Sequence, residues 1–159
     1  MKNNLIDEIT IHDENNIKGF FYQYRFLSNF ELGDVYFEGE LYVSSENAYQ
    51  AAKTLDLDLR KEFKTISPNE AKSLGRNINL REDWEKEKLN IMFLICFDKF
   101  YRNKDFREKL LFTGNRYLEE TNYWNDVFWG TCNGVGENNL GKILMQIRSC
   151  FALLSNQNG

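Results

Sequence analysis

Residues 35–53 read VYFEGELYVSSENAYQAAK, and this stretch combines the signals of a strand pair with those of a helix start. Apolar and polar residues alternate on both sides of Glu38-Gly39, a pattern typical of a hairpin whose turn lies at that dipeptide. Ser44 and Ser45 then precede good helix formers, as N-cap residues do, which places Glu46 in the first turn of a helix.

The segments on either side of this stretch predict further helices. Ser67-Pro68-Asn69-Glu70 has the pattern of a helix start, with serine as the N-cap, proline at the first position and glutamate at the third. Gly75 is expected to end that short helix. Apolar residues three and four apart predict two longer helices, at about 82–102 and over 140–154.

Strand signals outside the hairpin are weaker. Alternation over 20–26 predicts a strand, and residues 117–118 and 127–128 fit short strands or extended loop. The sequence therefore predicts an α+β fold, a helix-dominated single domain with a few short strands.

Length and composition limit the classes of protein. A chain of 159 residues is expected to form one domain over 1–159, of which 1–18 could be a loosely packed N-terminal segment. A formal charge of −4 predicts no general attraction to nucleic acid or to an anionic membrane. The polar start and the lack of a long apolar run predict a cytoplasmic protein with no membrane association.

Cysteine and histidine are scarce, which limits the chemistry. The three cysteines lie far apart, and there is one histidine, His12. Neither a disulfide framework nor a ligand set for a transition metal can be built from them. The sequence predicts no metal, and proton transfer must fall to carboxylates, lysine, tyrosine or water.

Glu46 and Lys53 are the most informative pair of charged residues. Seven positions on a helix bring two side chains to within roughly 20° of a common face. A carboxylate and an amine could therefore look into one pocket, with Glu46 kept ionised by the positive end of the helix. On spacing alone, the same pair also fits a solvated helix whose charges complement its dipole.

A second candidate region runs from Trp124 to Gly141. It contains WNDVFWG at 124–130 and a glycine-bearing loop, NGVGENNLG at 133–141, before the last helix. Free N–H groups at such a helix start could cradle a phosphate. An ordinary surface loop capped by Asn138 or Asn139 is the alternative.

Taken together, these segments resemble the NADAR, or YbiA-like, domain family over nearly the whole chain and in the same order. The matching pieces are FLSNF at 26–30, SSENAYQAAK at 44–53, Ala71 with LGR at 74–76, Trp84 with Lys88 and Met92, Lys99-Phe100, Leu110-Leu111, Leu118 with Glu120, Trp129-Gly130, Gly136 with Asn138, and Leu140-Gly141 with Leu144, Met145 and Arg148.

Two positions depart from the family pattern. The family usually has histidine where this chain has Asn47, so any role of that histidine must be dispensable or shared with the asparagine. Arg25 stands where a glycine usually precedes FLSNF, which could narrow the pocket or add a phosphate contact. The reaction type is therefore more transferable than the substrate.

The resemblance implies an N-glycosidase that needs no cofactor. Members split the N–C1′ bond of ribosylated aminopyrimidine intermediates of riboflavin synthesis, and others remove ADP-ribose from modified guanine. Such chemistry needs carboxylates to stabilise an oxocarbenium-like ribose and aromatic surface to hold the base. The catalytic candidates are Glu46, Lys53, Asp126 and Trp129; the substrate-binding candidates are Ser28, Asn29, Phe30, Arg76, Trp84, Lys88, Gly136, Asn138 and Gly141.

Several alternatives stay open. Lys53 could orient Glu46, or it could attack C1′ of an opened ribose and form an imine. Arg76 could simply neutralise a helix end, Trp84 could be core, and Asp126 could be a turn residue. The expected substrate is a phosphorylated ribosyl-aminopyrimidine. An ADP-ribosyl substrate, with nucleic acid only as a modified substrate, and a non-catalytic sensor of ADP-ribose or NAD are the alternatives.

Overall fold

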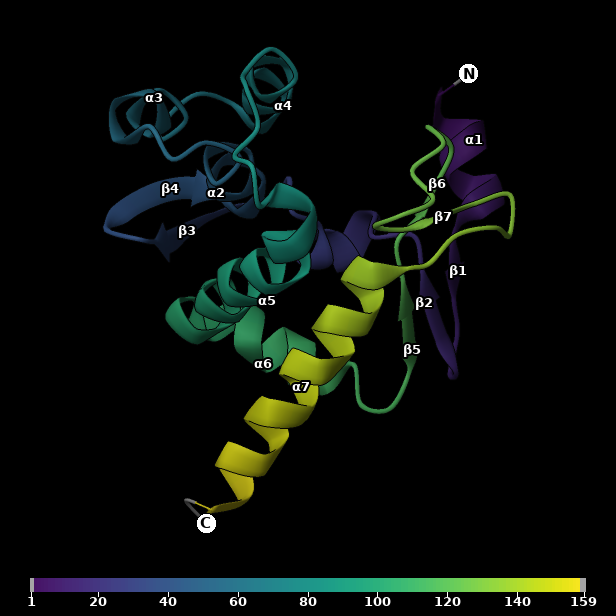
Figure 1. The fold of residues 1–159 in the computed structure, drawn as a ribbon. Coiled ribbons are helices and arrows are strands. Elements are labelled where there is room, and N and C mark those ends of the chain that lie inside the picture. The colour runs from purple at the N-terminus through teal and green to yellow at the C-terminus, as the bar shows by residue number, and fades with distance from the viewer. Residues whose placement is uncertain (1, 158–159) are drawn as a thin grey trace. The chain divides into compact units, whose positions relative to one another are not determined.

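The computed structural model describes residues 2–157, with side chains from residue 4 onward, and confirms the α+β class (Figure 1). Contacts divide the chain into two compact units, one of residues 29–106 and one of the flanking residues up to 28 and from 107 on. We name them the central unit and the terminal unit, and each is described by itself. The single-domain organisation stays a prediction.

The central unit begins with the hairpin that the sequence predicts. Strands β3 (Leu32–Phe37) and β4 (Glu40–Ser44) pair antiparallel, with Val35 opposite Tyr42. Glu38 and Gly39 both have positive φ, 43° and 93°. Two such residues in a two-residue turn match the right-handed twist of the strands, which is why glycine suits the second position.

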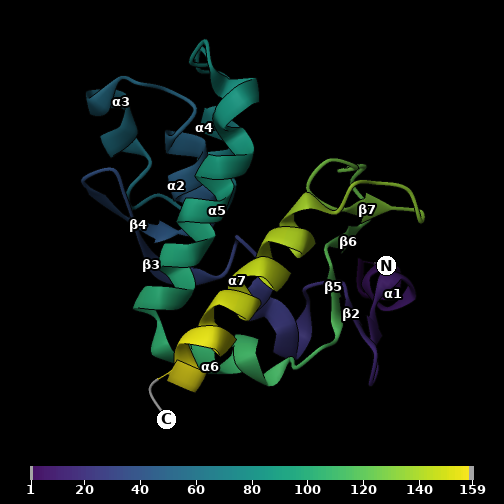
Figure 2. The same ribbon diagram turned by 60° about the horizontal axis from the view of Figure 1, so that its bottom comes forward.

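Four helices of the central unit follow the hairpin: α2 (Ser45–Ala51), α3 (Leu57–Glu62), α4 (Pro68–Gly75) and α5 (Trp84–Arg102). The expected caps are present: Ser44 Oγ accepts a hydrogen bond from Asn47 N, and Ser67 with Glu70 forms a capping box. In Figures 1 and 2, α5 runs beside α2 and the hairpin. Its buried face carries Trp84, Ile91, Met92 and Ile95, as the periodicity predicts, while Lys88 is only half-buried.

The boundary between the two units falls within α6 (Lys104–Phe112), a helix that the sequence did not predict. The rest of the terminal unit is built from α1 (Lys2–Ile9), β1 (Ile11–His12), β2 (Asn16–Lys18), the 3₁₀ helix η1 (Tyr22–Leu27), β5 (Tyr117–Glu119), β6 (Thr121–Asn122), β7 (Thr131–Cys132) and α7 (Asn139–Gln157).

In the terminal unit a three-stranded sheet of order β1-β2-β5 packs against α7. The approach is close at Gly141, where a Cβ would lie 2.2 Å from Leu118 O. A side chain there would collide with the backbone of β5. Gly141 therefore sets the distance between the helix and the sheet.

Several predictions need correction. Residues 22–27 form η1 rather than a strand, since Tyr22 has a φ of 54° and the adjacent Phe26 and Leu27 are both buried. A half-exposed strand would bury alternate residues. Residues 127–128 are not in a strand, and Leu154 is 49% exposed although the helical periodicity continues through it. In the N-terminal segment, Ile17 is fully buried and pairs with Leu118, while the other described side chains up to residue 18 are exposed or half-buried.

The buried hydroxyl of Tyr42 leads to a first prediction. Its oxygen has no hydrogen-bond partner among the described residues, and burial raises the pKa of Tyr42 to about 12. We expect Tyr42→Phe to leave the free energy of unfolding unchanged at neutral pH or raise it by up to about 1 kcal/mol, since an unpaired polar atom is removed.

The pH dependence has a definite sign. The unfolded tyrosine loses its proton near pH ~10, before the folded one, so wild-type stability should fall as the pH rises from about 10 towards 12. Tyr42→Phe should lose less over this range in denaturant titrations. A loss above about 1 kcal/mol at neutral pH would mean that the hydroxyl has a partner.

Candidate active site

Helix α2 presents the carboxylate of Glu46 in a largely buried position. Glu46 is 7% exposed, and its Oε1 accepts a hydrogen bond of 2.8 Å from Gln50 Nε2. Its backbone N donates to Asn29 O at 3.0 Å, which ties the helix start to the chain before the hairpin. The carboxylate therefore sits in the first helical turn, where the positive end of the helix dipole favours negative charge.

Lys53 lies two residues beyond the end of α2 and is half-buried. Burial lowers the pKa of its amine; Glu46 opposes this shift, while Arg76 and Lys72 add to it. Three charged side chains of the central unit thus act on Lys53. This interaction supports the prediction that Glu46 and Lys53 serve one site.

Aromatic rings adjoin Lys53. Its Nζ lies 5.4 Å from the ring centroid of Tyr49, and the Tyr49 and Trp84 rings lie 5.2 Å apart between centroids. Trp84 is only 5% exposed, so most of its surface belongs to the core, as the structural alternative expected. Lys88 pairs with Glu85 on the same helix.

The contacts of residues 28–30 are mainly structural. Asn29 is buried, its Nδ2 lies 3.4 Å from Met92 Sδ, and Cys96 Sγ lies 3.7 Å from its Oδ1. Ser28 is the C-cap of η1, and the Phe30 ring centroid lies 5.6 Å from Lys72 Nζ. Asn29 therefore holds α5 and the start of α2 together, which makes it a support for the site.

Asn47 does not face the site. Its Nδ2 donates to Phe63 O at 2.8 Å and to Ile66 O at 2.7 Å, and its Oδ1 accepts from Ser44 Oγ. The side chain is fully buried and fastens the connection between α3 and α4. Where the family has histidine, this chain thus has a structural amide.

In the terminal unit, Asp126 shapes the loop that carries Trp129. Its Oδ1 accepts from Trp129 N at 2.9 Å and from Phe128 N at 3.2 Å, as the turn interpretation expected. Asn122, which the sequence analysis missed, bonds both backbone groups of Asp126: its Nδ2 donates to Asp126 O and its Oδ1 accepts from Asp126 N. The Trp129 ring packs edge-on against Phe128, with centroids 4.8 Å apart.

Three N–H groups at the start of α7 already have partners within the terminal unit. The N–H groups of Asn138, Asn139 and Leu140 donate to the carbonyls of residues 130, 128 and 129. Asn138 is buried with a φ of 53°, and a Cβ on Gly136 would lie 2.3 Å from Gly130 O. These three N–H groups anchor the 128–130 backbone, which favours the loop interpretation, and a phosphate site in this region stays a prediction.

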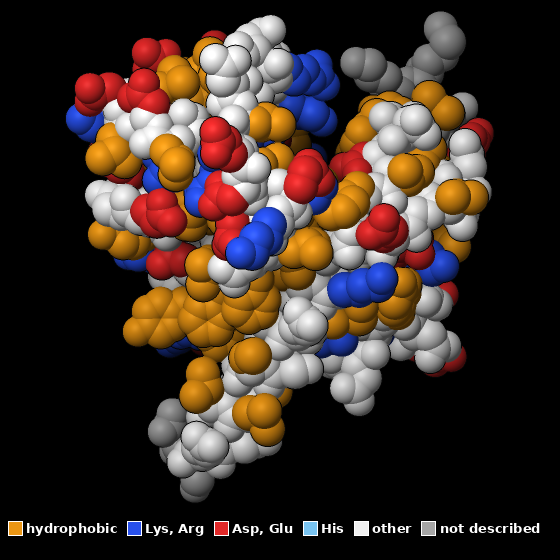
Figure 3. Space-filling view, in the orientation of Figure 1, with side chains coloured by type: hydrophobic (Ala, Val, Ile, Leu, Met, Phe, Trp, Pro, Cys, Tyr) orange, Lys and Arg blue, Asp and Glu red, His pale blue; other side chains and the backbone are white. Residues whose placement is uncertain are grey.

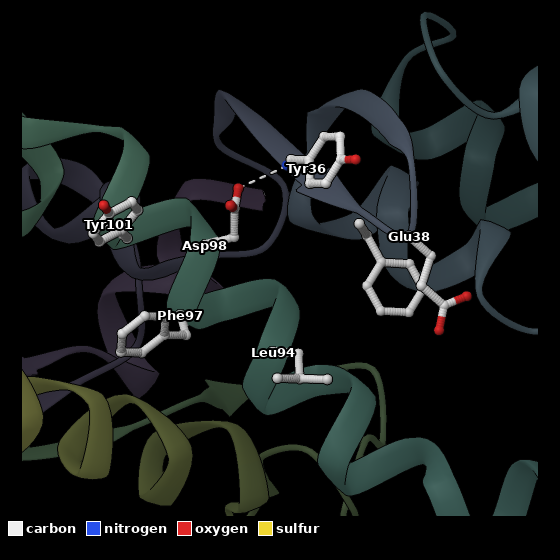
Figure 4. Close-up of a pocket in the computed structure, with 7 residues that line it drawn as sticks. Tyr36, Glu38, Leu94, Phe97, Asp98 and Tyr101 are labelled. Carbon is white, nitrogen blue, oxygen red and sulfur yellow. Dashed lines mark hydrogen bonds between the residues drawn. The ribbon is translucent and has the colours of Figure 1, made fainter.

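A separate hollow of about 350 Å³ lies between β3 and α5 on the central unit (Figure 4). It is lined by Tyr36, Phe37, Glu38, Leu94, Phe97, Asp98 and Tyr101. Hydrophobic side chains gather over this end of α5 in the space-filling view (Figure 3). Its carboxylates already bind protein groups, since Asp98 accepts from Tyr36 N and from Arg102, and Glu38 pairs with Arg60. None of the predicted site residues lines it.

Comparison with known proteins places this arrangement in a family. A family model described as the NADAR domain matches residues 11–152. N-glycosidase YbiA of Escherichia coli is 35% identical over 130 residues, which cover 79% of this chain and 81% of that protein. A riboflavin biosynthesis protein of Vibrio vulnificus is 35% identical over 127 residues, or 77% of this chain and 34% of that protein.

The solution structure of E. coli YbiA is similar as well, with a TM-score of 0.79 at 31% identity over 92% of this chain and 90% of that one. The chain therefore belongs to the NADAR family, as its motifs suggested. It is a hydrolase that acts on N-glycosidic bonds. Within residues 2–157, no helix is long and apolar enough to cross a membrane, and no cluster of three potential metal ligands occurs.

The lowered pKa of Lys53 can be measured against that of Lys61. Lys61 is exposed, and its hydrogen bond to Asp58 raises its pKa. A lower pKa leaves more neutral amine at a given pH, so Lys53 should reach half-maximal labelling by a small amine reagent at a lower pH than Lys61. Midpoints from mass spectrometry, rather than absolute rates, separate this effect from poorer access. A Lys53 midpoint at or above that of Lys61 would contradict the shift.

Proposed function

We propose that this protein hydrolyses the C1′–N bond of a phosphorylated ribosyl-aminopyrimidine. The observation that carries the proposal is the buried carboxylate of Glu46, which acts electrostatically on Lys53, an amine whose pKa is lowered by burial. The names of relatives support the substrate class, since the Vibrio vulnificus protein bears a riboflavin biosynthesis name.

In this proposal Glu46 stabilises the positive charge that develops on the ribose as the base departs. A carboxylate held in one orientation in a site shielded from water does this more effectively than one in water. Glu46 meets both conditions because it is nearly buried and bonded to Gln50. Its place at the N-terminal end of a helix suits an ionised carboxylate rather than a proton donor.

Lys53 is assigned the covalent role. Its amine adds to C1′, the C1′–N bond to the base breaks, and the base leaves with a proton. The sugar ring opens to give an imine, and water then releases the sugar and restores the amine. Only the neutral amine can attack, and the lowered pKa of Lys53 increases that fraction. The alternative is that Lys53 only orients Glu46 by charge.

Other residues complete the proposal. Arg76 is exposed at the end of α4 and acts electrostatically on Lys53, so it is the proposed phosphate contact of the central unit. In the terminal unit, Asp126 and Trp129 stay proposed catalytic residues, on a loop that Asn122 and α7 hold in shape.

The reaction is tested by offering the purified protein three substrates: a ribosyl-aminopyrimidine phosphate, DNA with ADP-ribosylated guanine, and NAD. Released sugar is scored by mass spectrometry. Ribose phosphate from the first substrate is the expected result. Release of ADP-ribose from DNA or NAD alone would replace the metabolite by an ADP-ribosyl substrate, and stoichiometric binding without release would leave a sensor.

Replacing Glu46 by glutamine should remove the catalytic charge and preserve the side-chain shape. We expect Glu46→Gln to lower kcat by at least about a hundredfold with an unchanged melting temperature. The matched control is Glu62→Gln, an exposed residue at the end of α3, which should retain wild-type turnover. Near-normal turnover by folded Glu46→Gln would exclude Glu46 as the catalytic carboxylate.

The covalent role of Lys53 predicts an adduct. Borohydride added during turnover should reduce the imine and leave a protein heavier by the reduced sugar phosphate, with the mass mapped to the peptide that contains Lys53. Lys53→Ala and Lys53→Arg should give no adduct, and Lys61→Ala should give the wild-type amount. Activity of Lys53→Arg without any adduct would reduce Lys53 to an orienting charge.

A further inference from the structure

Gln50 is a buried amide whose described contacts converge on Glu46. It is 4% exposed and lies one turn after Glu46 on α2. Its Nε2 donates to Glu46 Oε1 at 2.8 Å, while its Oε1 has no hydrogen-bond partner among the described residues. A buried amide oxygen without a partner destabilises the folded state. The chain carries this cost at the position that binds its proposed catalytic carboxylate.

Gly75 provides the space that Gln50 occupies. A Cβ on Gly75 would lie 1.9 Å from Gln50 Oε1 and 2.8 Å from its Cδ. The backbone of Gly75 is helical at the end of α4, where alanine has a higher helix propensity than glycine. Helix propensity therefore does not account for the glycine, whereas contact with Gln50 does.

We propose that Gln50 is a positioning residue for Glu46, and that Gly75 is the partner that lets Gln50 take this position. The inference rests on the proposed function of Glu46. Because the amide end of Gln50 is confined between α2 and Gly75, it presents Nε2 to the carboxylate and restricts rotation of the Glu46 side chain. A side chain on Gly75 would displace a flexible amide rather than backbone, so the effect falls on the geometry of Glu46 more than on stability.

The test is a cycle of Gly75→Ala, Gln50→Ala and the double variant, with Ser73→Ala, an exposed residue of α4, as the control. Gly75→Ala and Gln50→Ala should each lower kcat by about tenfold with KM within about twofold, because misplacing a group that acts in the transition state lowers turnover rather than binding. The double variant should be no slower than Gln50→Ala. Additive losses of about a hundredfold, or wild-type kcat in Gln50→Ala, would overturn the inference.

Crystal structures of the wild type and of these variants test the inference without any substrate. In Gly75→Ala the Gln50 amide should move out of hydrogen-bond distance of Glu46, and the Glu46 carboxylate should leave its wild-type position in both single variants. An unmoved carboxylate in Gln50→Ala would overturn the positioning role. If the wild type releases no sugar from any of the three substrates, the proposed function fails, while these structures still decide the place of Gln50.

Discussion

Burial of α2 is the constraint on which the central unit depends. All seven residues of this helix are buried, although Ser45, Glu46, Asn47 and Gln50 are polar. Polar groups removed from water need partners inside the protein. The side chain of Asn47 therefore donates to two carbonyls of the connection between α3 and α4, and the side chain of Gln50 donates to Glu46. The backbone N–H of Glu46, at the start of α2, donates to the carbonyl of Asn29. The hairpin, the connection and α4 are arranged around these bonds.

The same constraint explains why a departure from the family pattern is tolerated. The side chain of Asn47 forms hydrogen bonds with two backbone carbonyls and with the N-cap Ser44. Its role is therefore structural rather than catalytic. Glu46, the neighbour of Asn47 in the chain, and Lys53 are the proposed catalytic residues. The proposed catalytic residues and the buried residues with a structural role thus lie together within nine residues of sequence, 45–53.

The terminal unit supports its loop in a different way. Backbone N–H groups at the start of α7 bind the carbonyls of residues 128–130, and Asn122 and Asp126 close the turn before them. These N–H groups stabilise a loop instead of an anion. Three donors at this helix start are therefore already occupied in the fold, because carbonyls of the preceding loop satisfy N–H groups that a phosphate could otherwise bind.

The sequence by itself determined the elements whose signals are local: the Glu38-Gly39 turn, the Ser44 cap, the capping box at Ser67, and the apolar faces of α5 and α7. Each depends on residues within a few positions of one another. The family motifs likewise predict that Glu46 and Lys53 serve one site. Only the tertiary structure showed that Asn47 is a core residue, that Gly75 makes room for Gln50, and that the loop at 128–130 uses the N–H groups of α7. These contacts join residues of different elements, so their partners become known only when the chain has folded.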